Sequence, residues 1–189
     1  MSDFTTNYNS IQGWFDFSDI YSRIVGAQIV DGSKVVEVGS WLGKSAIFLA
    51  NQIKEKGINA DFYCVDIWEG ITGVSDIDKI IKMHGGSVYD IFLGNIEKCG
   101  VSDFIKPIKK DSVSASRKFK NNSLDFCFID ALHTYEAVKE DIKTWLPKVK
   151  PGKYIGGHDA DRECVQRALN EVLGNNWYRD SERSWLYAK

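Results

Sequence analysis

The sequence predicts an α/β protein in which a mostly parallel sheet lies between two layers of helices. Short runs of β-branched and aromatic residues alternate along the chain with amphipathic segments of helical period. This alternation is typical of parallel strands joined by crossover helices. Acids also stand at or just after four predicted strand ends: Asp66, Asp111, Asp130 and Asp159. Because parallel strands present their carboxyl ends at one edge, we expect a polar site there.

The first half of the chain begins with an aromatic-rich segment whose apolar residues recur at helical spacing. An Asp-Gly-Ser turn then precedes a valine-rich strand, which is followed by a glycine turn and a helix. In chain order we expect a helix over 18–28, a strand over 35–38, a helix over 44–56, a strand over 62–68, helical pieces over 76–83 and 88–97, a strand over 104–108 and a helix over 112–119.

The second half repeats the pattern. An apolar run ending on Asp130 predicts a strand, and Val138, Ile142 and Trp145 lie on one face of the helix that follows. Pro and Gly within 150–153 stand in the order of a type II turn. We therefore expect a strand over 124–130, a helix over 134–146, a turn over 150–153, a strand over 154–157, a helix over 162–173 and short strands over 177–179 and 185–188.

Length and composition favour a single compact domain over 1–189, with an N-terminal loop and helix over 1–30. Hydrophobic residues make up 43% and charged residues 26% of the 189 residues, and the net charge is -2. No dense Lys/Arg block, long apolar run or signal pattern is present, so we expect no nucleic-acid partner, no membrane partner and a cytoplasmic location. The four cysteines lack metal-type spacing and are expected to be free thiols. We expect the glycine-rich segment 69–100 to cover the substrate.

The glycine turn within VVEVGSWLGKS (35–45) is the strongest motif, because a strand, a tight turn and a helix point backbone N–H groups at a ligand. A phosphate-binding P-loop needs four residues between its first glycine and Gly-Lys-Ser, whereas three separate Gly39 from Gly43. Trp41 is also bulky for a phosphate cradle. A nucleotide-dependent phosphotransferase, with Asp130 as the metal-binding acid, stays open as the alternative.

Two acids near this turn favour a different ligand. In the dinucleotide pattern, the second glycine lets a pyrophosphate approach the backbone. Trp41 stands in its place here, which counts against NAD or FAD. Glu37, just before Gly39, suits an amino group and repels pyrophosphate, whereas Asp66 can accept hydrogen bonds from ribose hydroxyls. An amino group, a ribose and an adenine together describe S-adenosylmethionine.

The motifs EVGSWLGKS (37–45), VDIWEG (65–70), FIDALHTYE (128–136), LPKVKPG (146–152) and GGHD (156–159) occur in this order. In this respect the chain resembles class I S-adenosylmethionine-dependent methyltransferases, in the branch of macrolide-sugar O-methyltransferases and cephalosporin-hydroxylase-like proteins. The resemblance runs from about Trp14 to the C-terminus. It implies a three-layer Rossmann-like methyltransferase fold with seven strands, the last of them antiparallel, and a cofactor at the first four strand ends.

The resemblance also implies roles for individual residues. It assigns the methionine part of the cofactor to the turn, its carboxylate to a serine hydroxyl, the ribose to an acid, and the adenine to an apolar wall and the third strand end. The implied cofactor-binding residues are Glu37, Gly39, Ser40, Gly43, Ser45, Asp66, Trp68, Asp111, Ser112 and Asp130.

Methyl transfer to oxygen also needs the acceptor proton to be removed. His133 and Asp130 are the catalytic candidates, with His133 either a general base or a cap of the helix that follows. Asp130, His158 and Asp159 lie on strand ends that this fold makes neighbours, so they hold a divalent ion or form a hydrogen-bonded loop. We expect O-methylation of a small molecule. A catalytically inactive cofactor-binding subunit and a homo-oligomer stay open.

Overall fold

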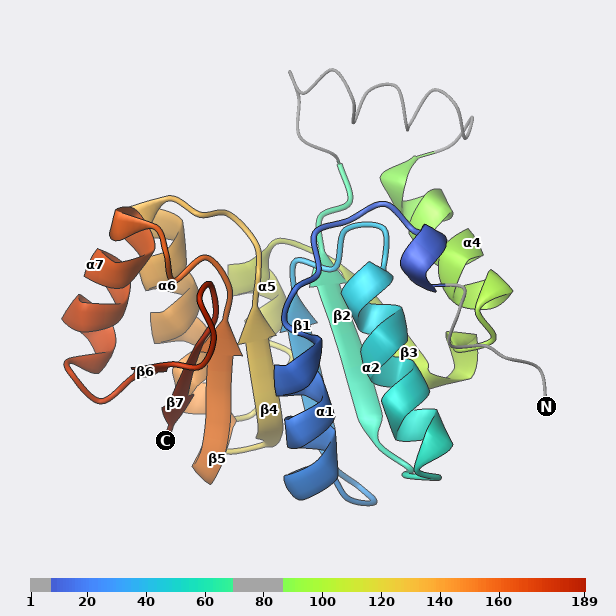
Figure 1. Cartoon of the computed structure of the whole chain (residues 1–189), viewed down its shortest axis with the longest axis horizontal. Coiled ribbons are helices and arrows are strands. Elements are labelled where there is room, and N and C mark those ends of the chain that lie inside the picture. Colours follow the sequence, from blue (N-terminus) through green and yellow to red (C-terminus); the bar gives the residue numbers. More distant parts are fainter. Residues whose placement is uncertain (1–7, 70–86) are drawn as a thin grey trace.

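The computed structural model describes residues 8–69 and 87–189 as a sheet between two layers of helices (Figure 1). The predicted helical piece over 76–83 and most of the predicted substrate cover lie outside these residues. The described helices are α1 (Ser18–Ala27), α2 (Lys44–Glu55), α4 (Val88–Lys98), α5 (Ser112–Ser116), α6 (Tyr135–Trp145) and α7 (Glu163–Leu173). The strands are β1 (Lys34–Val38), β2 (Asp61–Asp66), β3 (Ile105–Lys109), β4 (Leu124–Ile129), β5 (Val149–Gly157), β6 (Tyr178–Arg179) and β7 (Trp185–Ala188).

The seven strands lie in the order β3-β2-β1-β4-β5-β7-β6. The first five are parallel, and β7 pairs antiparallel with both β5 and β6. The predicted fold, including the antiparallel last strand, is confirmed. The strand order reverses between β1 and β4, which is where sheets of this kind bind ligands.

Each face of the sheet has its own apolar core. Val35, Phe126 and Phe128 pack with buried residues of α1, α2 and α4, whereas Val36 and Cys127 pack with those of α5, α6 and α7. Alternate residues of β1 and β4 thus point to opposite faces, and both faces are covered, as continuous apolar strands require.

The prediction of a turn over 150–153 was wrong. These residues continue β5, which starts at Val149 and shifts register between Leu124 and Phe126 of β4. Gly152, at φ +75°, donates its backbone N–H to Lys189, whose own N–H bonds the Lys153 carbonyl. The bend predicted by Pro and Gly is therefore present as an irregularity within a strand, where the C-terminus supplies the partners that a free turn would lack.

Two smaller expectations concern helices and thiols. The helix expected over 112–119 stops at Ser116, whereas the one expected over 88–97 is α4, whose N-terminus carries a capping box between Ser87 and Asp90. All four cysteines are free. Within the described ranges, no helix has the length and apolar character needed to cross a membrane.

Candidate active site

The glycine turn leaves the carboxyl end of β1 and enters α2 at Lys44. Gly39 has φ +92° and donates its N–H to the Val65 carbonyl of β2 at 2.8 Å. A Cβ at this position would overlap the Asp130 carbonyl oxygen and lie 2.5 Å from its carbonyl carbon. Gly39 is therefore required both for its left-handed conformation and for the close passage of β4. Gly43, also at φ +92°, precedes the first residue of α2.

Trp41 occupies the position that counted against a dinucleotide site, yet it adopts the left-handed conformation of a glycine, at φ +45°. Its backbone N–H donates to Asp66 Oδ2 at 2.9 Å, and its carbonyl accepts from Trp68 Nε1 at 2.7 Å. Its indole donates to Gln12 at 2.6 Å. These three contacts hold a conformation that a bulky residue rarely adopts.

Glu37 is fully buried beneath the turn. Its Oε1 accepts a short hydrogen bond from the Ser45 hydroxyl. Its Oε2 and the buried hydroxyl of Tyr21 have no hydrogen-bond partner within residues 8–69 and 87–189. Burial raises the pKa of Glu37 to about 8, against the hydrogen bond from Ser45 and helped by the charges of Asp130 and Asp66. A buried acceptor without a donor fits the amino group of the predicted cofactor.

Asp66, at the end of β2, joins the turn to the strand edge. Its two oxygens accept the backbone N–H groups of Trp41 and Trp68, and burial raises its pKa despite these bonds. Further lone pairs remain on both oxygens for ribose hydroxyls. Trp68 itself is buried against Tyr89 and Phe92, with ring centroids 4.9 and 4.7 Å away.

The other predicted cofactor residues have identifiable structural partners. Asp111 is exposed and caps α5 by accepting the Ser114 N–H at 2.8 Å, which lowers its pKa. The Ser112 hydroxyl accepts from Trp145 Nε1 at 2.8 Å. Ser40 is buried in the turn, where its carbonyl accepts the Gly43 N–H. Roles for these residues at the adenine or the methionine part stay predictions.

A second group of polar side chains lies at the ends of β4 and β5. One ligand-type atom each from Asp130, His133 and Asp159 falls within a span of 4.8 Å. His133 Nδ1 lies 2.7 Å from Asp159 Oδ2, and the His133 side chain is 38% exposed. The cap of α6 is Thr134, whose hydroxyl accepts the Ala137 N–H, so the alternative role of His133 as a helix cap is wrong.

His158 is not one of these three residues. Its side chain is buried between the carboxylates of Asp16, Asp130 and Asp159. Its Nε2 lies 2.7 Å from Asp16 Oδ1, and its Nδ1 lies 3.6 Å from Asp130 and 3.7 Å from Asp159. Burial opposes protonation, but hydrogen bonds to Asp130 and Asp159 and the charges of Asp130 and Asp16 raise the pKa of His158 to about 10. A ring that carries both protons has no lone pair for a metal.

Asp159 has φ +59° and is almost completely buried. Its Oδ1 accepts from Arg183 Nη2 at 2.6 Å and from Arg162 Nε at 3.1 Å. Its Oδ2 accepts from His133. Burial would raise the pKa of this carboxyl, but the bonds from His133 and His158 outweigh it and hold the pKa far below its usual range. The sequence did not identify Arg183 or Arg162, because no local pattern marks an arginine that reaches back to a strand end.

The predicted divalent ion does not fit this donor set. Both oxygens of Asp159 are already bonded to side chains, and His158 faces carboxylates with both ring nitrogens. A dication bound to Asp159 would also share that carboxylate with two guanidinium groups. Unit positive charges about 5 Å apart repel by roughly 3 kcal/mol at an effective dielectric constant of about 20, and a dication doubles this.

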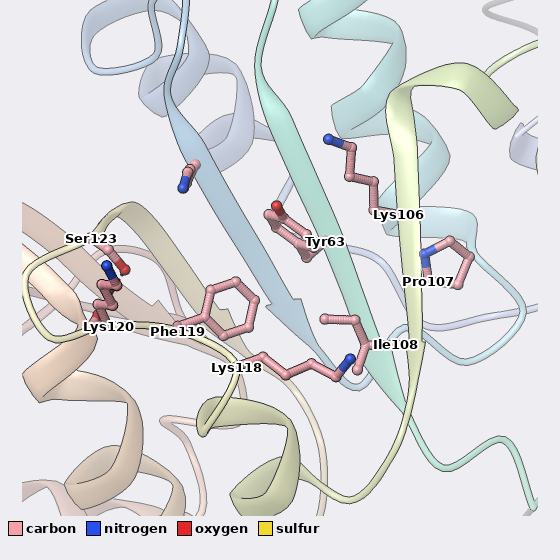
Figure 2. Close-up of a pocket in the computed structure, with 9 residues that line it drawn as sticks. Tyr63, Lys106, Pro107, Ile108, Lys118, Phe119, Lys120 and Ser123 are labelled. Carbon is pink, nitrogen blue, oxygen red and sulfur yellow. Dashed lines mark hydrogen bonds between the residues drawn. The ribbon is translucent and has the colours of Figure 1, made fainter.

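A separate hollow of about 380 Å³ lies beside β2 and β3 (Figure 2). Lysines 34, 106, 118 and 120 surround it, with Tyr63 and Phe119 among its apolar lining. None of the predicted site residues lines it, so the candidate site remains the edge formed by the carboxyl ends of β1, β2, β4 and β5.

The strand order, the glycine turn and the acids after β1 and β2 define the cofactor-binding fold of class I S-adenosylmethionine-dependent methyltransferases. Residues 36–160 match a family model described as a methyltransferase domain. The chain therefore belongs to this family of methyltransferase domains.

Similar proteins support the fold. The chain is 23% identical over 128 residues to the uncharacterized protein y4gI of Sinorhizobium fredii, covering 68% of this chain and 13% of that protein. It thus spans about an eighth of the length of this relative. The solved O-methyltransferase NovP superimposes with a TM-score of 0.68 at 14% identity, over 91% of this chain and 78% of NovP. An rRNA methylase from Streptococcus thermophilus gives 0.58 at 13% identity, over 88% and 91%.

Replacing Asp66 tests the cofactor half of the site. We expect Asp66→Ala to weaken binding of S-adenosylhomocysteine about 100-fold, because it removes the ribose acceptor and the bond that holds Trp41. Isothermal titration calorimetry measures this change. The control is Asp61→Ala at the start of the same strand, which removes a surface pair with Lys106 and should change affinity less than about twofold. Equal losses in the two variants would refute the assignment.

The buried carboxyl of Glu37 predicts a pH dependence. Because its folded-state pKa of about 8 lies above its ordinary value of 4.5, the folded protein holds an extra proton between these pH values. Its stabilising contribution is complete below about pH 4.5 and is lost as pH rises through 8.

We therefore expect Glu37→Gln, which cannot ionise, to gain stability relative to the wild type as pH rises from 5 to 8.5, by a few kcal/mol in unliganded protein. Urea unfolding at several pH values measures this difference. A pH-independent difference would show that Glu37 is already ionised in the folded state.

Proposed function

We propose that this methyltransferase acts on a hydroxyl group of a small molecule, with His133 as the general base. The observation that carries the proposal is the 2.7 Å contact between His133 Nδ1 and Asp159 Oδ2 at the edge where β4 and β5 end. An imidazole that donates its Nδ1 proton to a carboxylate keeps a lone pair on Nε2. The carboxylate also stabilises the imidazolium formed when Nε2 takes a proton.

The residues of the proposed site form two groups, one that binds the cofactor and one that acts on the acceptor. The turn at Gly39, with Glu37 and Asp66, binds and orients the cofactor, and His133 receives the proton of the acceptor hydroxyl. S-adenosylmethionine supplies a methyl group on a positively charged sulfur. The acceptor oxygen would take this methyl group, and the electron pair of the carbon–sulfur bond would stay with the sulfur. The hydroxyl proton passes to His133 Nε2, so charge is balanced.

The overall charge of the chain favours a small acceptor over RNA. Its formal net charge is -2, whereas a protein that binds nucleic acid usually carries a basic face. The match to a methyltransferase family counts against the alternative of a nucleotide-dependent phosphotransferase. In addition, Ser45, whose hydroxyl a P-loop would offer to magnesium, donates its hydroxyl to Glu37 instead.

A labelled-methyl assay tests the proposal. S-adenosylmethionine with an isotopically labelled methyl group is incubated separately with panels of sugars and phenols, with amines and thiols, and with total RNA. We expect label in methyl ethers of one class of hydroxyl compound, and no transfer by His133→Ala. Label found in RNA or on nitrogen alone would overturn it, and label in no panel despite cofactor binding would favour the inactive-subunit alternative.

A further inference from the structure

The carboxylates beside His133 are neutralised by side chains of the chain itself. Asp159 bonds Arg183 at 2.6 Å and Arg162 at 3.1 Å, and Asp16 lies 3.4 Å from Arg183 Nη1. His158 stands between Asp16, Asp130 and Asp159. Three negative groups therefore face three groups that can carry positive charge.

We propose that Arg183 and His158 are built-in cations that do here what a bound divalent ion would do, so that the reaction runs without a metal. This inference rests on the proposed function of His133 and adds two positioning residues to it. Arg183 fixes Asp159, which orients His133 through its other oxygen. His158 lies between Asp130 and Asp16 and keeps the end of β4 close to the segment that precedes α1.

The backbone supports a built position for Arg183 rather than a chance surface contact. Arg183 lies in the loop between β6 and β7, and its carbonyl accepts the Ala160 N–H at 2.7 Å. Its guanidinium reaches three carboxylates, on Asp16, Asp159 and Asp161, through three different nitrogens. A fork-shaped donor held at both backbone and side chain is pre-organised for this role. The C-terminal hairpin is thus part of the site.

His158 is fixed as closely. Its backbone N–H donates to the Ile129 carbonyl at 3.1 Å, and its ring lies 5.1 Å from that of Phe17, which stacks on Phe128. Its Nε2 lies 2.7 Å from Asp16, and its Nδ1 lies 3.6 Å from Asp130 and 3.7 Å from Asp159, so carboxylates on both sides of the ring favour its positively charged form. The position therefore accommodates a fixed cation and offers no free electron pair to a metal.

Manganese titration followed by electron paramagnetic resonance tests the proposal without a methyl donor or acceptor. Failure of hydroxyl methylation would therefore leave this result unaffected. We expect wild-type protein to leave Mn²⁺ free up to millimolar concentration. We expect the double variant Arg183→Met, His158→Asp, which removes both cations and adds a carboxylate, to bind one ion.

Two outcomes would overturn the proposal. One is micromolar binding of Mn²⁺ by the wild type that Asp130→Asn abolishes. The other is a folded double variant that binds no ion, since the two cations would then not be what excludes it. If the double variant does not fold, the wild-type titration alone decides.

Turnover supplies a second readout once an acceptor is found. We expect wild-type activity to survive EDTA, and Arg183→Met to lower kcat about 10- to 100-fold with partial rescue by Arg183→Lys. The matched control is Arg179→Met, because Arg179 lies on the same hairpin but, among residues 8–69 and 87–189, its guanidinium bonds the Ala160 carbonyl and no carboxylate. Loss of activity in EDTA that Mn²⁺ restores, or equal losses in the two methionine variants, would contradict the positioning role.

Discussion

Gly39→Ala is expected to destabilise the protein by about 3–5 kcal/mol, the sum of a left-handed backbone cost and a steric overlap. Gly39 has φ +92°, and an added Cβ would meet the Asp130 carbonyl and lie 2.9 Å from the Ala131 Cα. These are backbone atoms at the end of β4, so they cannot rotate away. Moving them would also displace the ends of β1 and β4, and S-adenosylhomocysteine binding should be lost. Urea unfolding and calorimetry measure the two effects.

Alanine substitutions at two other glycines distinguish the backbone cost from the steric overlap. Gly32 has φ +80° with no atom within 4 Å of an added Cβ, so Gly32→Ala carries the backbone cost alone, about 1–2 kcal/mol. Gly94 lies within α4 in open space, and Gly94→Ala should be neutral or stabilising by up to about 1 kcal/mol. If Gly39→Ala behaved like Gly32→Ala and kept its ligand, the close packing of the turn against β4 would be wrong.

His133→Ala is expected to lower kcat by about 10²- to 10⁴-fold, the usual contribution of a positioned base. Affinity for S-adenosylhomocysteine should stay within about twofold, because none of the cofactor contacts proposed at Glu37, Gly39 and Asp66 involves His133. Steady-state kinetics on the acceptor found in the labelled-methyl assay measures the first effect, and calorimetry measures the second.

His133→Asn distinguishes a base from a structural partner of Asp159. The asparagine amide can still donate to a nearby carboxylate, but it cannot accept a proton at neutral pH. We expect this variant to be as inactive as His133→Ala. If it recovered near wild-type turnover, His133 would serve only to satisfy Asp159, and the proton would leave by another route.

Much of the fold could be predicted because the pattern of apolar residues reports burial directly. The valine-rich run before Gly39 and the apolar run before Asp130 are strands that are buried on both faces. The first ends at the glycine turn and the second at Asp130. The error over 150–153 has a tertiary cause. Pro and Gly predict a turn locally, whereas pairing with Lys189, far along the chain, extends β5 through them.

The positions of Glu37, Asp66, Asp130 and Asp159 at or beside strand ends could be predicted, whereas their roles stay predictions. What the sequence could not predict is which partner each acid takes. Arg183 and Asp16 are separated by 167 residues, and only the finished sheet brings them together. His158 was predicted either as a metal ligand or as part of a hydrogen-bonded loop, and we propose a buried cation instead because Asp16, Asp130 and Asp159 surround its ring. In the sequence, Trp41 argued against a phosphate or dinucleotide site because it replaces a glycine of the pattern. In the structure, three tertiary hydrogen bonds hold Trp41 in the left-handed conformation that a glycine would adopt.

Calorimetric titration with S-adenosylhomocysteine, in parallel with ATP, measures whether the site at the end of β1 binds the cofactor of methyl transfer. We propose that this site consists of the turn at Gly39, the buried Glu37 and the acid Asp66. We predict saturable binding of one S-adenosylhomocysteine per chain, loss of that binding in Gly39→Ala and Asp66→Ala, and no heat with ATP. Tight binding of ATP with no response to S-adenosylhomocysteine would contradict the account.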